Sequence, residues 1–121
     1  MYYNYNSMTQ EELREFALKN ENDFVRYCAV EKITDQETLK YIALKKHEVF
    51  EVRIQAVRRL TDQETLKHIA LNDEHWKIRK EAVERLIDQE TLRHIALNDD
   101  HWEVRCSATI RLHKWKIIVK N

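Results

Sequence analysis

Residues 61–86 read TDQETLKHIALNDEHWKIRKEAVERL, and this stretch decides the fold because it recurs along the chain. Residues 87–112, IDQETLRHIALNDDHWEVRCSATIRL, keep 17 of its 26 residues in register. Residues 34–60 carry the same unit with one inserted residue, and residues 8–33 are a diverged first copy. An internal repeat of this length is typical of proteins whose units stack. The segments outside the four repeats are 1–7 and 113–121.

Each repeat is expected to form two short helices joined by a polar turn. In the third repeat, Thr61 precedes Glu64 by three residues, which predicts a capping box; Asp62 is the alternative cap. Asn72 and Asp73 interrupt the apolar pattern, so they mark the turn and can cap the second helix. The apolar residues that recur at helical spacing are Leu66, Ile69 and Ala70, then Trp76, Ile78, Ala82, Val83 and Leu86.

These helices are too short to be stable alone, so stacking must bury their apolar stripes. One alanine column on each helix permits close approach of neighbouring helices. The sequence therefore predicts an all-α fold, an α-solenoid of four stacked two-helix repeats forming a single domain over 1–121. The two columns are Ala17, Ala43, Ala70 and Ala96, and Ala29, Ala56, Ala82 and Ala108.

One polar column lies inside the apolar arc of the second helices. We call it the arginine ladder, and it consists of Arg26, Arg53, Arg79 and Arg105. A partly buried guanidinium needs hydrogen-bond acceptors. We expect the two central arginines to be mostly buried and bonded to carboxylates or helix-end carbonyls, which would set the stacking register; anion binding is the alternative. The acceptors within reach are Asp73 and Asp99, or the caps Asp35, Asp62 and Asp88.

Composition excludes several classes of site. The chain has no Gly and no Pro among its 121 residues. Without glycine it cannot build a phosphate-binding loop, a dinucleotide-binding turn, an EF-hand loop or a nucleophile elbow, and tight β-hairpins are disfavoured. Lys and Arg total 21, as do Asp and Glu. The zero net charge argues against bulk attraction to nucleic acid or anionic lipid.

The cysteine count and the hydropathy pattern indicate the compartment. Cys28 and Cys106 are the only cysteines, and stacking at roughly 10 Å per repeat would keep them too far apart for a disulfide. The first thirty residues hold no apolar run of signal-peptide length, and no stretch approaches the ~20 apolar residues of a membrane span. We therefore expect a cytoplasmic, soluble protein with two free thiols and no membrane partner.

The second helices resemble those of HEAT-type repeats. The matching residues are a Val-Arg or Ile-Arg pair with an alanine three residues after the arginine, as at Ile78-Arg79 and Ala82. These repeats are 26–27 residues long, whereas common HEAT units run about 40–47. The resemblance is therefore to compact bacterial-type HEAT repeats, with the leucine-rich repeat variant as the near alternative. It implies a solenoid whose second helices line the concave, partner-binding side.

No pattern indicates catalysis, a cofactor or a metal. His68 and His94 share one column and His75 and His101 another, so members of a pair lie a repeat apart, too far to share zinc. We expect these histidines to be exposed or to cap helices. Ser107 and Cys106 have no local base. The recurring aromatics Phe50, Trp76 and Trp102 are expected to pack in the core or between repeats. We therefore expect a protein that is not an enzyme and needs no cofactor.

The outward face of the second helices is the candidate partner-binding surface, because it is less polar than a purely solvated face. We call it the second-helix face. Its residues are Phe24, Tyr27, Ile54, Arg58, Lys80, Glu84, Cys106 and Ile110. The expected function is a non-catalytic protein–protein interaction scaffold for a protein or peptide, monomeric or weakly self-associating through the solenoid ends. Single exposed apolar residues are also normal on any surface.

Two other functions remain open. Nucleic acid could bind through the basic second repeat and the C-terminal tail, although alternating charges along the face make a phosphate-tracking groove a poor fit. The resemblance also admits an accessory lyase role, since some bilin lyase subunits are HEAT-like. The basic residues concerned are Lys40, Lys45, Lys46, Arg53, Arg58 and Arg59, with Lys114, Lys116 and Lys120 in the tail.

The C-terminal segment is expected to continue the last helix. No capping residue follows Leu112, and apolar residues recur on one helical face at Leu112, Trp115 and Val119. We expect Trp115 and Val119 to cover the open end of the stack, because a terminal repeat has no neighbour to bury it. A truncated fifth repeat is the alternative.

Overall fold

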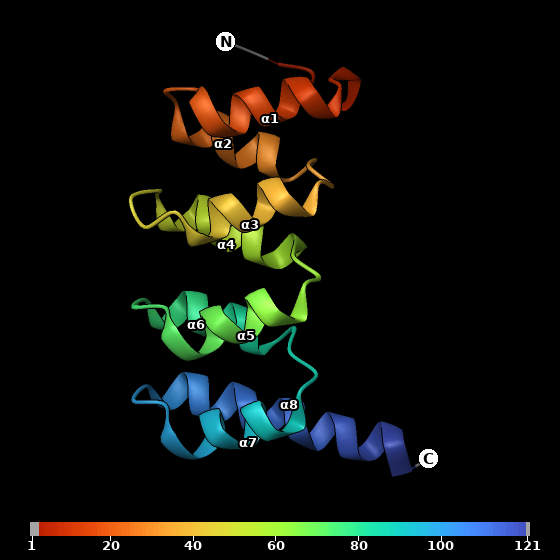
Figure 1. Ribbon diagram of the computed structural model, residues 1–121, viewed down its shortest axis with the longest axis vertical. Helices are drawn as coiled ribbons and strands as arrows, with labels where there is room; N and C mark the ends of the chain where they lie inside the picture. Colours follow the sequence, from red (N-terminus) through yellow and green to blue (C-terminus); the bar gives the residue numbers. More distant parts are fainter. Residues whose placement is uncertain (1–2, 121) are drawn as a thin grey trace. The chain divides into compact units, whose positions relative to one another are not determined.

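The computed structural model describes residues 3–120, with side chains for residues 3–114. Within this range all regular structure is helical, as the repeat pattern predicts (Figure 1). A short 3-10 helix, Tyr5–Ser7, precedes the eight α-helices. The helices are α1 Gln10–Lys19, α2 Asp23–Val30, α3 Gln36–Leu44, α4 Phe50–Arg59, α5 Gln63–Asn72, α6 Trp76–Val83, α7 Gln89–Asn98 and α8 Trp102–Lys120.

The chain divides into two compact units, Met1–Leu60 and Thr61–Asn121, which we call the N-terminal and C-terminal units. In the N-terminal unit α1 packs on α2, α3 packs on α4, and α2 packs on α4. The C-terminal unit has the same plan, in which α5 packs on α6, α7 on α8, and α6 on α8. Each unit therefore holds two helix pairs joined through their second helices. A single domain over 1–121 stays a prediction.

The first helix of a repeat begins at an aspartate in three repeats. In the third repeat the cap is Asp62, so the expected capping box from Thr61 is wrong and the alternative holds. The Asp62 carboxylate accepts from both the backbone N–H and the hydroxyl of Thr65, which ties the cap to the first turn twice. In the first repeat, Thr9 and Glu12 do form a capping box. The equivalent aspartate caps are Asp35 and Asp88, bonded to Thr38 and Thr91.

The turn between helices is held by acidic and histidine side chains. The Asp73 carboxylate accepts from the N–H of His75 at 3.0 Å, and His75 Nδ1 accepts from the N–H of Lys77 at 3.2 Å. Asp99 and His101 repeat this arrangement in the fourth repeat. Capping by His75 and His101 confirms the role expected for these histidines. Asp73 thus supports the capping residue instead of capping the second helix itself.

The core consists of the apolar columns read from the sequence. Alanines of the two predicted columns are between 0% and 1% exposed, except Ala96 in α7, which is half-buried. The leucine and isoleucine residues that end the first three repeats are buried as well. The small side chains of both columns, apart from Ala96, therefore lie in the core. The end residues are Ile33 at 1%, Leu60 at 3% and Leu86 at 0% exposure.

The last helix runs past the end of the fourth repeat. α8 extends to Lys120 and projects beyond the end of α7 (Figure 1), which confirms that the second helix continues after Leu112. The side chains of Trp115 and Val119, expected to cover the open end, lie outside the residues whose side chains are described. The described helices include none that combines the length and the apolarity needed to cross a membrane.

Candidate functional site

The second-helix face takes its shape from the way consecutive second helices pack. In the N-terminal unit, Val25 and Ala29 of α2 point into the core, and this turns Phe24 and Tyr27 outward. In the C-terminal unit, Val104 and Ala108 of α8 are buried, and Ile110 is left on the outside. A groove lies between the two second helices of each unit.

The groove of the N-terminal unit is mainly apolar. It is a pocket of about 450 Å³ between α2 and the beginning of α4. Phe24 is 67% exposed, although it is a large aromatic residue. The Phe24 and Tyr27 rings lie nearly parallel, with centroids 6.5 Å apart and an interplanar angle of 14°. The lining residues are Asp23, Phe24, Tyr27, Val49, Glu51 and Val52.

The groove of the C-terminal unit is mainly basic. It is a pocket of about 270 Å³ between α6 and α8. Lys80 lies 3.8 Å from Glu103, a long and partly exposed ion pair. Ile110, 51% exposed, is the apolar residue at this pocket. The lining residues are Lys80, Glu84, Ser107, Ile110, Arg111 and Lys114.

The structure brings five of the eight predicted face residues to these two pockets. Phe24 and Tyr27 meet in the N-terminal unit, and Lys80, Glu84 and Ile110 meet in the C-terminal unit. The other three are not pocket residues: Ile54 is half-buried, whereas Arg58 and Cys106 are exposed.

The two central side chains of the arginine ladder are buried and donate to backbone carbonyls at helix ends. Arg53 and Arg79 are only 7% and 8% exposed, so the expected burial of the central two is confirmed. Arg53 donates from Nε and Nη2 to the carbonyl of Ala43, at 2.9 and 2.8 Å, in the last turn of α3. Arg79 Nη1 donates to the carbonyl of Asp73 at 2.9 Å. Carbonyls at a helix C-terminus lack intrahelical donors, so the guanidinium satisfies them.

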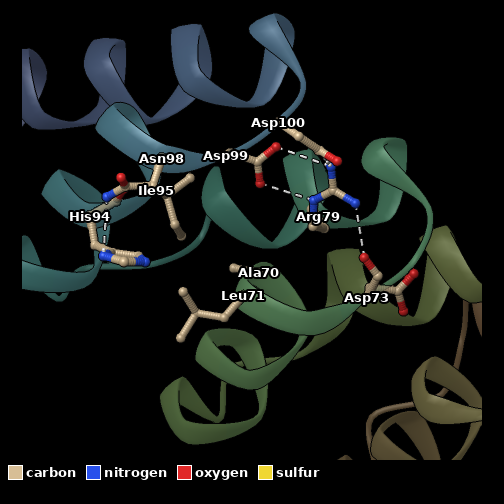
Figure 2. A pocket seen from close by; sticks show the side chains of 9 residues that line it. All are labelled: Ala70, Leu71, Asp73, Arg79, His94, Ile95, Asn98, Asp99 and Asp100. Atoms are coloured by element: carbon tan, nitrogen blue, oxygen red, sulfur yellow. Dashed lines mark hydrogen bonds and ion pairs between the residues drawn. The ribbon is translucent and has the colours of Figure 1, made fainter.

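Arg79 also reaches across to the next repeat. Figure 2 shows its guanidinium between the turn residue Asp73 and the carboxylates of Asp99 and Asp100, beside a pocket of about 340 Å³. The Asp100 carboxylate accepts from Nη2 at 2.8 Å. In the N-terminal unit, Arg26 pairs in the same way with Glu48, whose side chain is 4% exposed. Of the predicted acceptors, Asp99 is used through its carboxylate and Asp73 through its backbone carbonyl. The caps Asp35, Asp62 and Asp88 bond to threonines.

The ion pair between Arg79 and Asp99 shifts the pKa of both side chains. The hydrogen bond to Asp99 raises the pKa of the Arg79 guanidinium, against the opposing effect of burial. Burial raises the pKa of the Asp99 carboxyl, but the hydrogen bonds from Arg79 and from the His101 N–H outweigh it, and the pKa falls below its usual value. Both groups are therefore charged near neutral pH. With its donors occupied inside the protein, Arg79 is unsuited to the alternative role of binding an external anion.

The recurring aromatics divide between two environments. The Trp76 ring stacks on the His101 ring of the next repeat, with centroids 4.0 Å apart and an interplanar angle of 10°. Packing between repeats is thus confirmed for Trp76. Trp102 is 64% exposed, so the same expectation is wrong for this residue. The described part of the chain supplies no following repeat whose turn could stack on Trp102.

The remaining titratable side chains form no reactive cluster. His68 and His94 are exposed and lie beside Asn72 and Asn98, four residues further along their helices. Cys28 is a half-buried free thiol, and Cys106 is an exposed one. Partial burial raises the pKa of the Tyr5 hydroxyl, and the neighbouring Cys28 thiol acts in the same direction. In the part of the chain with described side chains, no three His, Cys, Asp or Glu side chains are grouped to hold a metal.

Sequence reasoning missed a glutamine column that joins successive repeats. Gln10 Nε2 donates to the carbonyl of Lys32, and Gln10 Oε1 accepts from the N–H of Thr34. Gln63 makes the same pair of bonds with Arg85 and Ile87. The signal was present, because each of the last three repeats begins its first helix with Gln-Glu-Thr.

A second missed column is basic and lies at the end of the second and fourth repeats. Arg59 Nε donates to the carbonyl of Ile33 at 2.8 Å, and Arg111 Nε donates to the carbonyl of Leu86 at 2.9 Å. Each bond runs from one repeat to the last residue of the repeat before it. These arginines therefore hold consecutive repeats together.

Comparisons with known proteins found no match for this chain, whether against family models, curated proteins or solved structures.

Proposed function

We propose that the protein is a non-catalytic interaction module, an α-solenoid of four HEAT-like helix pairs that binds a protein or peptide on its second-helix face. The observation that carries this proposal is the pocket between α2 and α4, where Phe24 is 67% exposed beside Tyr27 and two valines. An exposed large apolar side chain at a pocket is typical of an interaction site. Ile110 marks the corresponding groove of the C-terminal unit.

The contacts of the basic residues favour a protein partner over nucleic acid. Nucleic-acid binding requires cations that are available to phosphate. Arg53 is buried on the Ala43 carbonyl, and Arg59 donates to the Ile33 carbonyl. Two of the six basic residues of the second repeat are thus engaged in holding the fold together.

Affinity capture from a native lysate tests the proposal when it is run with matched variants. The face variant carries Phe24→Ser and Ile110→Ser. The control variant carries Tyr41→Ser and Leu97→Ser, which change residues that are 58% and 79% exposed on first helices. We expect the wild type and the control to capture the same partner, and the face variant to lose it.

Two results would contradict the proposal. One is a partner that the face variant retains as well as the wild type does. The other is duplex DNA binding whose affinity falls steeply with salt, because this is the signature of phosphate contacts.

A further inference from the structure

The pocket between α2 and α4 combines aromatic rings with carboxylates. Phe24 and Tyr27 supply two nearly parallel rings on α2, and the half-buried Val49, the N-cap of α4, supplies aliphatic surface. Val52 also borders the pocket but is buried. Asp23 and Glu51 complete the lining, and both are exposed. A volume of about 450 Å³ is enough for one or two side chains of a ligand.

The two carboxylates are available to a ligand. Among the described residues, no Lys, Arg or His nitrogen lies within ion-pair distance of Asp23 or Glu51. The nearby Glu48 differs, because both of its carboxylate oxygens accept from Arg26 and its side chain is 4% exposed. Asp23 and Glu51 thus place negative charge without an ion-pair partner at an apolar pocket.

The rings add a second attraction for cations. The face of an aromatic ring carries negative electrostatic potential, so a guanidinium or ammonium group is drawn to it. A guanidinium is planar and weakly hydrated, so it can lie on a ring while it donates to a carboxylate. The aliphatic surface of Val49 favours a different neighbour, an apolar side chain.

We propose that this pocket binds a peptide segment in which an arginine adjoins an aliphatic residue. The arginine lies on the Phe24 ring and donates to Asp23 and Glu51, while the aliphatic side chain packs on Val49. This inference rests on the proposed function and names the partner chemistry for one part of the second-helix face.

The groove of the C-terminal unit provides an internal contrast. Lys80, Arg111 and Lys114 line it against the single carboxylate of Glu84. A cationic peptide is repelled there, so its binding should be confined to the N-terminal unit. Binding of a cationic peptide at the N-terminal groove and not at the C-terminal groove would therefore support the proposed charge preference.

The test is a titration of the full chain with a short synthetic peptide that contains Arg-Leu-Arg-Leu between Gly-Ser ends. Binding is followed by backbone amide NMR shifts of ¹⁵N-labelled protein. We expect shifts at residues 23–27 and 49–52. A matched peptide with citrulline in place of arginine removes the charge but keeps the shape, and we expect it to bind about tenfold more weakly.

Variants test the named side chains. We expect Phe24→Ala and Glu51→Gln each to weaken the binding of the arginine peptide by about three- to tenfold. Their matched controls are Tyr41→Ala, an exposed aromatic on α3, and Glu37→Gln, an exposed carboxylate in the first turn of α3. Both controls should leave the affinity unchanged and should show that the binding is local.

Three results would overturn the inference: no shifts with the arginine peptide, equal affinity for the citrulline peptide, or shifts at Lys80 and Arg111. If an acidic peptide binds the C-terminal unit instead, the interaction function survives and only the arginine preference fails. If the captured partner is also retained by the Phe24→Ser and Ile110→Ser variant, the proposed function itself fails.

Discussion

Arg79 joins the third repeat to the fourth by donating from Nε and Nη2 to the two carboxylate oxygens of Asp99, at 2.9 and 3.0 Å. Both side chains are largely buried, at 10% and 8% exposure. The same guanidinium holds the end of α5 through the Asp73 carbonyl. One side chain therefore links a helix end to the turn of the next repeat. Arg26 does the same in the N-terminal unit, through the Asn20 carbonyl and Glu48.

Replacing Arg79 should be strongly destabilising. Arg79→Ala leaves the Asp99 carboxylate buried without its partner and bares a helix-end carbonyl. We expect the free energy of unfolding to fall by about 2–4 kcal/mol, measured by urea denaturation followed by circular dichroism. Arg93→Ala is the control, since Arg93 is exposed on α7 in the same unit. A loss no larger than that of the control would show that this ion pair contributes nothing.

Acid should remove the contribution that the Asp99 ion pair makes to the stability of the folded protein. Because its pKa in the folded protein is lowered, the ion pair stabilises fully above the unfolded value of about 3.9, and this stabilisation is lost as the pH falls through the folded pKa. We therefore expect the wild type to exceed Asp99→Asn in urea midpoint at pH 6, with a gap that closes below about pH 4. The Asp99 carboxyl stays ionised between pH 5 and pH 7, so its own titration contributes no change in the gap there. A gap that changes in that neutral range would point to a different titrating group.

The two tryptophans at equivalent positions should differ in their effect on stability. Trp76→Ala removes a ring stacked on His101, whereas Trp102→Ala removes a ring that is 64% exposed. We expect the loss of unfolding free energy to be larger for Trp76→Ala by about 1–2 kcal/mol. Parallel urea denaturation curves measure the difference. Equal losses would show that Trp102 packs as tightly as Trp76 does.

Both cysteines should titrate as free thiols. A thiol reagent added to the native protein should detect two groups, with Cys106 reacting first because it is exposed and Cys28 is half-buried near Tyr5. Cys106→Ser should abolish the fast phase and leave one thiol. Detection of no thiols in the monomer would mean that a disulfide exists and that the repeat arrangement is wrong.

Removing residues 113–121 should expose apolar surface. Thr109 is exposed and Leu112 is half-buried, whereas Val83 and Leu86 at the same positions of the third repeat are both 0% exposed. The described residues thus cover the end of the fourth repeat less than the end of the third, and the segment after Leu112 is the part of the chain expected to cover it. We expect truncation after Leu112 to lower the melting temperature and to promote association, seen by calorimetry and sedimentation. An unchanged melting temperature in a monomeric truncated chain would make the segment a binding arm instead of a cap.

Local features of the fold could be predicted from the sequence because their causes are local. Helix positions follow from the apolar spacing, and the aspartate before Gln-Glu-Thr caps its own first turn three residues away. The Thr61 cap was wrong because Thr61 and Asp62 are adjacent residues that both favour the N-cap position, and the Asp62 carboxylate takes it by bonding to Thr65. The continuation of α8 followed from the missing cap after Leu112.

The contacts between repeats could not be predicted as readily. Gln63 bonds to backbone groups that are 22 and 24 residues away. Its role therefore depends on how the first helix of a repeat packs against the end of the second helix of the same repeat. The pairing of Arg79 with Asp99 spans 20 residues, and the sequence offered several carboxylates of equal plausibility. Only packing selects among them.

Periodicity in the sequence is enough to predict the repeat, the helix pairs and the buried alanine columns. The cost of burying a charge is enough to predict that the central arginines need acceptors. The tertiary structure alone decided which equivalent residues are covered. Trp76 and Trp102 occupy the same repeat position, yet one stacks on His101 and the other is 64% exposed. It also gave the two second-helix grooves opposite charge, because each groove takes its lining from two helices that the chain brings together only on folding.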